Sequence, residues 1–183
     1  MKYQTKTETA IKDALVGLLA KKPLADVNVS ELARAAGVSR STFYEHFGNP
    51  GDVFDSLVDE ISDEMSPLMS QVACSDGFRS QGRPFCSLVR DEGERASVVR
   101  EQRFMDAFMM RHDAPEGHDL YELLVGAGYT EMQAKALCSF QMSGCFAAAR
   151  SARVSDGEWA EVRAAIDRFI LGGIAACLAA KHG

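Results

Sequence analysis

The sequence lacks the long apolar runs of a membrane protein and the leader of a secreted one. Its longest nearly apolar stretch, FILGGIAACLAA, ends after twelve residues, whereas a membrane-spanning helix needs about 18 to 20. The opening residues contain lysines but no apolar segment followed by a small-residue cleavage site. These absences predict a cytoplasmic protein with no membrane partner.

Cysteine is absent from the first 70 residues and forms no C-x-x-C pair anywhere. The five cysteines are an odd number, which argues against a disulfide framework, and their spacing argues against a zinc ribbon. Cys138 and Cys145 are seven residues apart and share one face of a predicted helix. We therefore expect them to be small buried apolar side chains.

The patterns of common enzymes are also missing. The sequence has no phosphate-binding glycine loop, no recognisable nucleophile–base pair and only four histidines, so we predict a protein that is not an enzyme and needs no cofactor. His112, Asp113, Glu116 and His118 lie near one another, but they lack the spacing of metal ligands. A solvated loop explains them better than a metal site.

Charge is distributed unevenly along the chain. The formal net charge is -6, but residues 1–50 contain seven Lys or Arg and five Asp or Glu, for a net +2. The remaining thirteen basic and twenty-one acidic residues give -8. Because an acidic surface repels phosphate, any contact with nucleic acid should come from the N-terminal segment.

Helical periodicity extends along almost the whole chain, which predicts an all-α protein. The first helix is expected at about Thr7 to Lys21, with Pro23 as a stop. The second begins at Ser30 as N-cap and ends before Gly37, and the third begins after Ser39. In the fourth, Asn49 is the cap and Pro50 the first helical residue.

The second and third helices have the layout of a helix-turn-helix. Two short helices flank one glycine in VSELARAAGVSRSTFYEHF, and Phe43 and Phe47 are i, i+4 partners expected to face inward. The outward row then contains the donor-rich side chains Arg40, Ser41, Thr42, Tyr44 and His46. A helix with donors over its first turns can reach base edges and phosphates in a major groove.

This segment resembles the DNA-binding segment of the tetracycline-repressor (TetR) family of bacterial transcriptional regulators, over about Thr7 to Ile61. The resemblance implies a three-helix DNA-binding domain at residues 1–49 and a helical effector-binding and dimerisation domain at residues 50–183. It also implies two kinds of DNA contact. Side chains facing base edges would be Arg40, Ser41 and Thr42, and those facing the DNA backbone would be Asn28, Ser30, Ser39, Tyr44 and His46. In the alternative reading, Ser30 and Ser39 are only helix caps and Tyr44 only packs.

One position departs from the family pattern. Most members have a lysine shortly after the His-Phe pair, where it meets a phosphate, but this chain has Pro50 there. Neither Gly48 nor Asn49 supplies the missing charge. We expect one ionic contact fewer per subunit and a shallower salt dependence of DNA binding.

The sequence of the C-terminal part predicts helices but contains no motif that identifies a ligand. Residues 66–75 continue or follow the fourth helix, residues 84–112 and 118–129 add shorter helices, and residues 130–152 and 156–181 form two long ones rich in Ala and Gly. In similar proteins such helices pair with a second subunit in a four-helix bundle, which implies a homodimer. Aromatic and methionine side chains could bind a small apolar effector or could simply be core; the candidates are Phe104, Met105, Phe108, Tyr121, Phe140 and Met142.

Two classes of function fit the sequence. The first, implied by the resemblance, is a dimeric repressor that binds a pseudo-palindromic operator in double-stranded DNA and is released by a small-molecule effector. The second is a protein-interaction adaptor that keeps the fold with weakened DNA contact. The missing lysine and the acidic net charge support the second.

Overall fold

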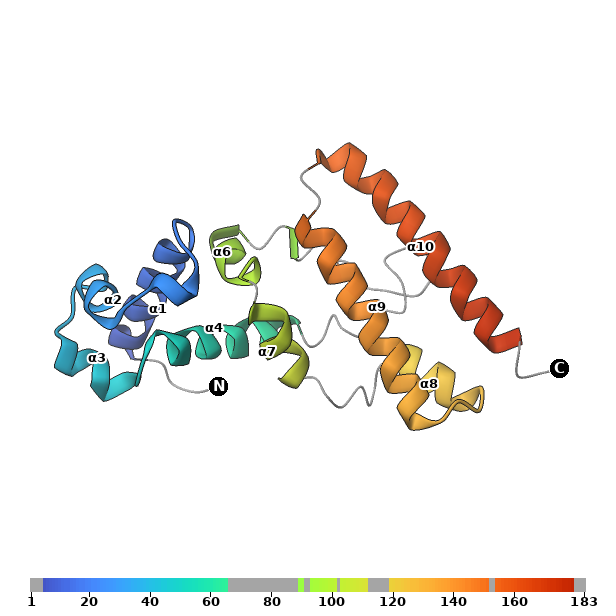
Figure 1. The fold of residues 1–183 in the computed structure, drawn as a ribbon, viewed down its shortest axis with the longest axis horizontal. Helices are drawn as coiled ribbons and strands as arrows, with labels where there is room; N and C mark the ends of the chain where they lie inside the picture. The colour runs from blue at the N-terminus through green and yellow to red at the C-terminus, as the bar shows by residue number, and fades with distance from the viewer. Residues whose placement is uncertain are drawn as a thin grey trace. The chain divides into compact units, whose positions relative to one another are not determined.

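The computed structural model describes residues 5–65, 89–90, 93–101, 103–111, 119–151 and 154–179. Every regular element in these ranges is helical, which confirms the all-α prediction (Figure 1). The elements are α1 (Lys6–Leu19), η1 (Leu24–Asp26), α2 (Val29–Ala35), α3 (Arg40–His46), α4 (Pro50–Met65), η3 (Gly93–Arg95), α6 (Ala96–Val99), α7 (Arg103–Arg111), α8 (Asp119–Gly126), α9 (Glu131–Ser151) and α10 (Asp156–Ala179). None of these helices combines the length and the apolar character needed to span a bilayer.

Some sequence predictions fall outside these ranges. The candidate helix at residues 66–75 is one of them, and so are Cys74, Cys86, His112, Asp113, Glu116 and His118. In the part of the chain that the structure describes, no three His, Cys, Asp or Glu side chains gather as metal ligands.

The chain divides into two compact units at positions that differ from the predicted boundary after residue 49. One unit contains Met1–Asp63 and Glu92–Arg111, and the other contains Glu64–Asp91 and His112–Gly183. Helices α4, α6 and α7 therefore belong with the three N-terminal helices. The cause is the apolar face of α4, whose side chains Val53, Phe54, Leu57, Val58 and Ile61 are all buried.

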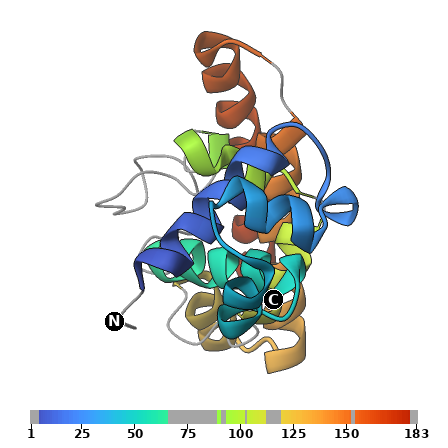
Figure 2. The same ribbon diagram turned by 90° about the vertical axis from the view of Figure 1, so that its left-hand side faces the viewer.

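Apolar packing and helix caps build the first three helices as the periodicity predicts. Ile11, Leu15, Leu32 and Phe43 have no exposed surface. Helix α1 begins with a capping box, in which the Thr5 Oγ1 accepts from the Glu8 N–H at 3.2 Å and the Glu8 Oε2 accepts from the Thr5 N–H at 2.9 Å. Figure 2 shows these three helices on the side that faces the viewer.

The predicted start of the second helix is wrong by two residues. Helix α2 begins at Val29, so Ser30 lies within its first turn instead of capping it. Asn28 is the N-cap, because its Oδ1 accepts from the Glu31 N–H at 3.0 Å. Asn and Ser are comparably good caps, so composition alone did not distinguish them.

Ion pairs attach α4 to the elements around it. Lys12 of α1, only 7% exposed in its side chain, pairs with Glu60, and the Arg95 Nη2 lies 3.9 Å from the other carboxylate oxygen of Glu60. From α7, the Arg103 Nη2 donates to both oxygens of Asp55 at 2.9 and 3.1 Å. Further along α7, Arg111 pairs with Asp59, which lies one turn after Asp55 on α4.

The second unit contains the two long helices, α9 and α10, which run in opposite directions (Figure 1). Leu120, Tyr121, Leu124 and Ala134 form a buried cluster against which side chains of α10 pack. The Tyr129 hydroxyl donates to the Cys177 carbonyl at 3.0 Å. Cys145 is buried, as expected, whereas Cys138 is half-buried, and burial raises the pKa of its thiol.

Removing the Glu60 carboxylate is expected to destabilise the protein more than removing the Lys12 ammonium. Glu60→Gln leaves Lys12 charged and buried beside a neutral group, which costs about 3 kcal/mol. Lys12→Met supplies an apolar chain and leaves Glu60 beside Arg95, so the loss should be about 1 kcal/mol. Urea unfolding measures both losses, and Asp63→Asn, an exposed carboxylate on α4, controls for lost charge. Equal losses in the two variants would contradict the burial argument.

Candidate nucleic-acid interface

The turn between α2 and α3 is fixed by one glycine and two backbone hydrogen bonds. Gly37 has φ +69°, a left-handed conformation that costs a residue with a side chain about 1–2 kcal/mol. The Gly37 N–H donates to the Arg34 carbonyl at 3.2 Å, and the Val38 N–H donates to the Ala33 carbonyl at 2.9 Å. This geometry ends α2 and sets the direction in which α3 leaves the turn.

Three hydroxyl groups cluster at the start of α3. The Ser39 Oγ accepts from the Thr42 N–H at 3.0 Å, which confirms Ser39 as the N-cap. The same oxygen lies 2.7 Å from the Ser41 Oγ and 2.9 Å from the Thr42 Oγ1. Arg40 and Ser41 are exposed, whereas Thr42 is half-buried. The first turn of α3 therefore presents one cation and a fixed set of hydroxyls.

Tyr44 combines packing with exposure. Its ring meets the fully buried ring of Phe43 edge-on, with the centroids 5.7 Å apart. Half of the residue, 51%, is nevertheless exposed. The packing and contact readings of Tyr44 are therefore compatible, because the inner edge of the ring is held while the rest of the side chain faces solvent. Phe47 is half-buried and tilts against Phe43, in agreement with the predicted inward pair.

His46 does not point freely outward, contrary to the prediction. Only 20% of its side chain is exposed, and its Nδ1 lies 3.5 Å from the Glu8 Oε1 of α1. The Thr5 N–H, which donates to Glu8, holds the pKa of that carboxyl below its usual value, and His46 lowers the pKa further. The last turn of α3 is thus attached to the first turn of α1.

The remaining predicted DNA contacts lie around the start of α2. Asn28 and Ser30 are both exposed, although the Asn28 Oδ1 is used as the helix cap. Sequence reasoning missed Glu8, which has a role in both the α1 cap and the His46 pair. The Thr-x-x-Glu spacing of Thr5 and Glu8 was the available signal for the cap.

The structure divides the six predicted effector contacts between the two units. Phe104, Met105 and Phe108 belong to α7 in the first unit, where Phe104 and Phe108 stack at 5.6 Å with no exposed surface. Tyr121, Phe140 and Met142 belong to the second unit. Phe140 is 70% exposed. Phe104 and Phe108 lie in a core, Met105 is half-buried, and Phe140 lies on an open face.

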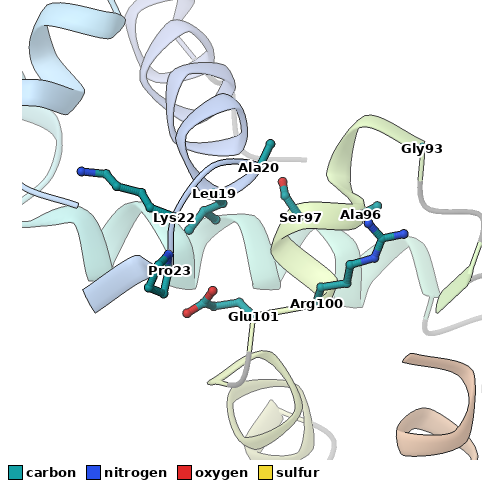
Figure 3. A pocket seen from close by; sticks show the side chains of 9 residues that line it. All are labelled: Leu19, Ala20, Lys22, Pro23, Gly93, Ala96, Ser97, Arg100 and Glu101. Carbon is teal, nitrogen blue, oxygen red and sulfur yellow. The ribbon is translucent and has the colours of Figure 1, made fainter. Parts of the chain in front are cut away.

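A groove of about 500 Å³ lies within the first unit, between the end of α1 and α6 (Figure 3). Three of the polar side chains that line it already bond within the protein. Lys22 pairs with Glu31, the Ser97 Oγ donates to the Val16 carbonyl at 3.0 Å, and Glu101 accepts from the Leu24 N–H at 3.1 Å. None of the six predicted effector contacts lines the groove. The groove is therefore a polar contact region between α1 and α6.

A tight glycine turn between two short helices, with hydroxyls and an arginine exposed on the second, defines the class as a helix-turn-helix DNA-binding domain. Comparison with known proteins agrees. Residues 11–57 match the family model of the bacterial regulatory proteins of the tetR family, and the N-terminal domain belongs to that family.

Relatives and solved structures extend this comparison. The transcriptional regulators EthR of Mycobacterium tuberculosis and Mycobacterium bovis are 36% identical to the chain over 66 residues, which is 36% of this chain and 31% of the relatives. The match thus spans less than a third of their length. The structure of the fatty acid degradation regulator FadR from Bacillus halodurans aligns over 97% of both chains, with a TM-score of 0.55 and 17% identity. That likeness shows the fold alone.

The same substitution at two glycines is expected to have opposite effects. Gly37→Ala forces a side chain into the left-handed region and should lower the free energy of unfolding by about 1–2 kcal/mol. Gly17→Ala, at an exposed position of α1 with open space around it, should raise it by about 0.5–1 kcal/mol. Thermal unfolding of the two variants measures both changes in the free energy of unfolding. A neutral Gly37→Ala would show that the turn does not need the left-handed conformation.

Proposed function

We propose that the protein is a dimeric transcriptional regulator that represses from a pseudo-palindromic operator and is released by a small-molecule effector. The observation that carries this proposal is the exposed first turn of α3, where Arg40 and the Ser39–Ser41–Thr42 hydroxyls sit beside a helix-turn-helix turn. Phosphate contacts set the position of such a helix, and base-edge contacts give it specificity.

The side chains of α3 divide by their position into two roles. Arg40 and Ser41 are exposed at the start of the helix, the part that reaches base edges when a recognition helix enters the major groove. Tyr44 and His46 lie one turn or more later, where a hydroxyl and an imidazole can meet backbone phosphates. Asn28 and Ser30, at the start of α2, would meet a neighbouring phosphate through their side chains and free N–H groups.

Arg40→Ala and Tyr44→Phe are expected to change DNA binding differently. Loss of a base contact by Arg40 should cost about 1–3 kcal/mol and relax the base preference at one position of each half-site. Tyr44→Phe removes only a hydroxyl and should weaken all sequences about equally. Selection of duplexes from a random library, repeated with each variant, measures both effects. Arg34→Ala, which removes an exposed arginine of α2, is the control for lost charge. A preferred sequence unchanged by Arg40→Ala would rule out base reading by this residue.

Exposed apolar side chains on the two long helices support a dimer. On α10 the residues Val162, Ala165, Phe169, Gly172 and Ala176 are all exposed and repeat at alternating spacings of three and four. This is the spacing of a helix seam. Helix α9 carries a second exposed series, Ala136, Phe140, Gly144 and Ala147. Each series contains one large exposed ring, Phe169 (72%) on α10 and Phe140 (70%) on α9, and exposed apolar side chains that adjoin along a helix face are typical of an interface.

The proposed interface predicts a dimer that a charge at its centre dissociates. Burying a phenylalanine stabilises an association by about 1.5–3 kcal/mol, so Phe169→Glu and Phe140→Glu should each shift the protein toward monomer. Because both rings are exposed within one subunit, the fold should be retained. Met110→Glu, an equally exposed apolar position on α7 (74%), is the matched control and should remain dimeric. Sedimentation velocity at micromolar concentration shows whether each variant is a monomer or a dimer. If both phenylalanine variants remain dimeric, this interface is contradicted.

Effector release is the remaining part of the proposal, and α4 supports it. Helix α4 begins at Pro50, just after the recognition helix, and its carboxylates pair with residues of α1, η3 and α7. A ligand that shifted η3 or α7 would therefore act on α4. To release DNA, the effector must prefer the state that does not bind DNA, and the operator must weaken effector binding by the same factor. A protein that dimerises but selects no duplex would favour the adaptor reading, which Pro50 and the acidic net charge support.

A further inference from the structure

His46, the last residue of α3, pairs with a carboxylate of α1. Its Nδ1 is 3.5 Å from the Glu8 Oε1. The second oxygen of Glu8 accepts from the Thr5 N–H, so the carboxylate is held in place from both sides. The other ring nitrogen, Nε2, lies on the opposite edge of the imidazole and is the atom left to meet a phosphate. That phosphate contact rests on the proposed function.

A neutral imidazole cannot satisfy both anions. It has one N–H donor and one acceptor nitrogen. If Nδ1 has the proton, it donates to Glu8 and presents a lone pair to the phosphate. If Nε2 has the proton, it donates to the phosphate and presents a lone pair to Glu8. Only the imidazolium, with an N–H on each nitrogen, donates to both.

We propose that DNA binding takes up a proton on His46, and that Glu8 is the positioning residue that makes this uptake necessary. Each subunit gains one proton, taken from solvent, and no other bond changes. By linkage, the species that binds the additional protons is favoured as pH falls. Affinity for DNA is therefore greatest at low pH and is lost as pH rises. With one proton per subunit, the association constant of the dimer falls by at most about a hundredfold per pH unit.

Charged groups on the elements around His46 have other partners or lie in solvent. On α1, Lys12 pairs with Glu60, and on α2, Glu31 pairs with Lys22. At the start of α4, Asp52 accepts from the Gly48 N–H at 2.9 Å and from the Asn49 Nδ2 at 3.0 Å. Arg34 of α2 and Arg40 and Glu45 of α3 are exposed. Among the described contacts, Glu8 is the carboxylate that pairs with the His46 ring.

Calorimetric titration of the full chain with its best duplex from a random library tests this directly. Performed at one pH in buffers with different ionisation heats, it counts the protons taken up, and its repetition from pH 6 to 8.5 gives the affinity profile. Wild type should take up protons and lose at least about tenfold in affinity across this range. His46→Gln should abolish the uptake, because its neutral amide can donate to a phosphate without titrating.

Glu8→Gln isolates the positioning role. Glutamine can still accept from the Thr5 N–H and keep the capping box, but its amide can also donate to Nδ1, so a neutral His46 can then bind phosphate. Proton uptake should fall below that of wild type. Glu45→Gln, a solvent-exposed carboxylate beside His46 on α3, makes the same charge change and should leave uptake unaltered.

The outcomes separate this inference from the proposed function. Unchanged uptake in His46→Gln places the proton elsewhere, and unchanged uptake in Glu8→Gln removes the role of Glu8; either result overturns the inference. Tight binding of wild type with no uptake also overturns it while leaving DNA binding intact. Failure to bind any duplex between pH 6 and 8.5 contradicts the proposed function itself.

Discussion

The first unit depends on the packing of α4 against the helices that precede and follow it. Its apolar face is fully buried, and three of its carboxylates, Asp55, Asp59 and Glu60, meet cations from α1, η3 and α7. The Lys12–Glu60 pair is the most buried of these contacts, and a buried charge cannot lose its partner without a large cost. The helix-turn-helix is thereby held in one unit with residues 93–111, far along the chain.

Local features could be predicted from the sequence, but contacts between distant segments could not. Apolar periodicity located α1, α9 and α10, the cap Ser39 located the start of α3, and Pro50 as first helical residue located the start of α4. Lys12 and Glu60 are 48 residues apart, as are Asp55 and Arg103. Periodicity shows which face of a helix is apolar but not what covers it. For the same reason periodicity could not show that the aromatic side chains of α7, Phe104 and Phe108, stack in a core.

The candidate site likewise combines features that the sequence predicts with one that it does not. The exposed row on α3 followed from the position of Phe43, because a buried ring on one face leaves Arg40, Ser41 and Tyr44 on the other. His46 did not follow this pattern, since Glu8 lies across from it on α1. The same carboxylate caps α1 and contacts His46 of α3, so a residue that the sequence marks only as a helix cap also joins two helices. The end of α3 is therefore supported by a contact with α1 that the sequence of α3 alone does not indicate.

Direct identification of the bound DNA tests the central claim, that paired α3 helices read a two-fold site. Fragments of the source genome that the purified protein retains can be sequenced and then footprinted. The account predicts enriched fragments that share an inverted repeat, with protected half-sites about one helical turn, or a multiple of it, apart. Retention without a shared sequence, or protection of an isolated half-site, would contradict it.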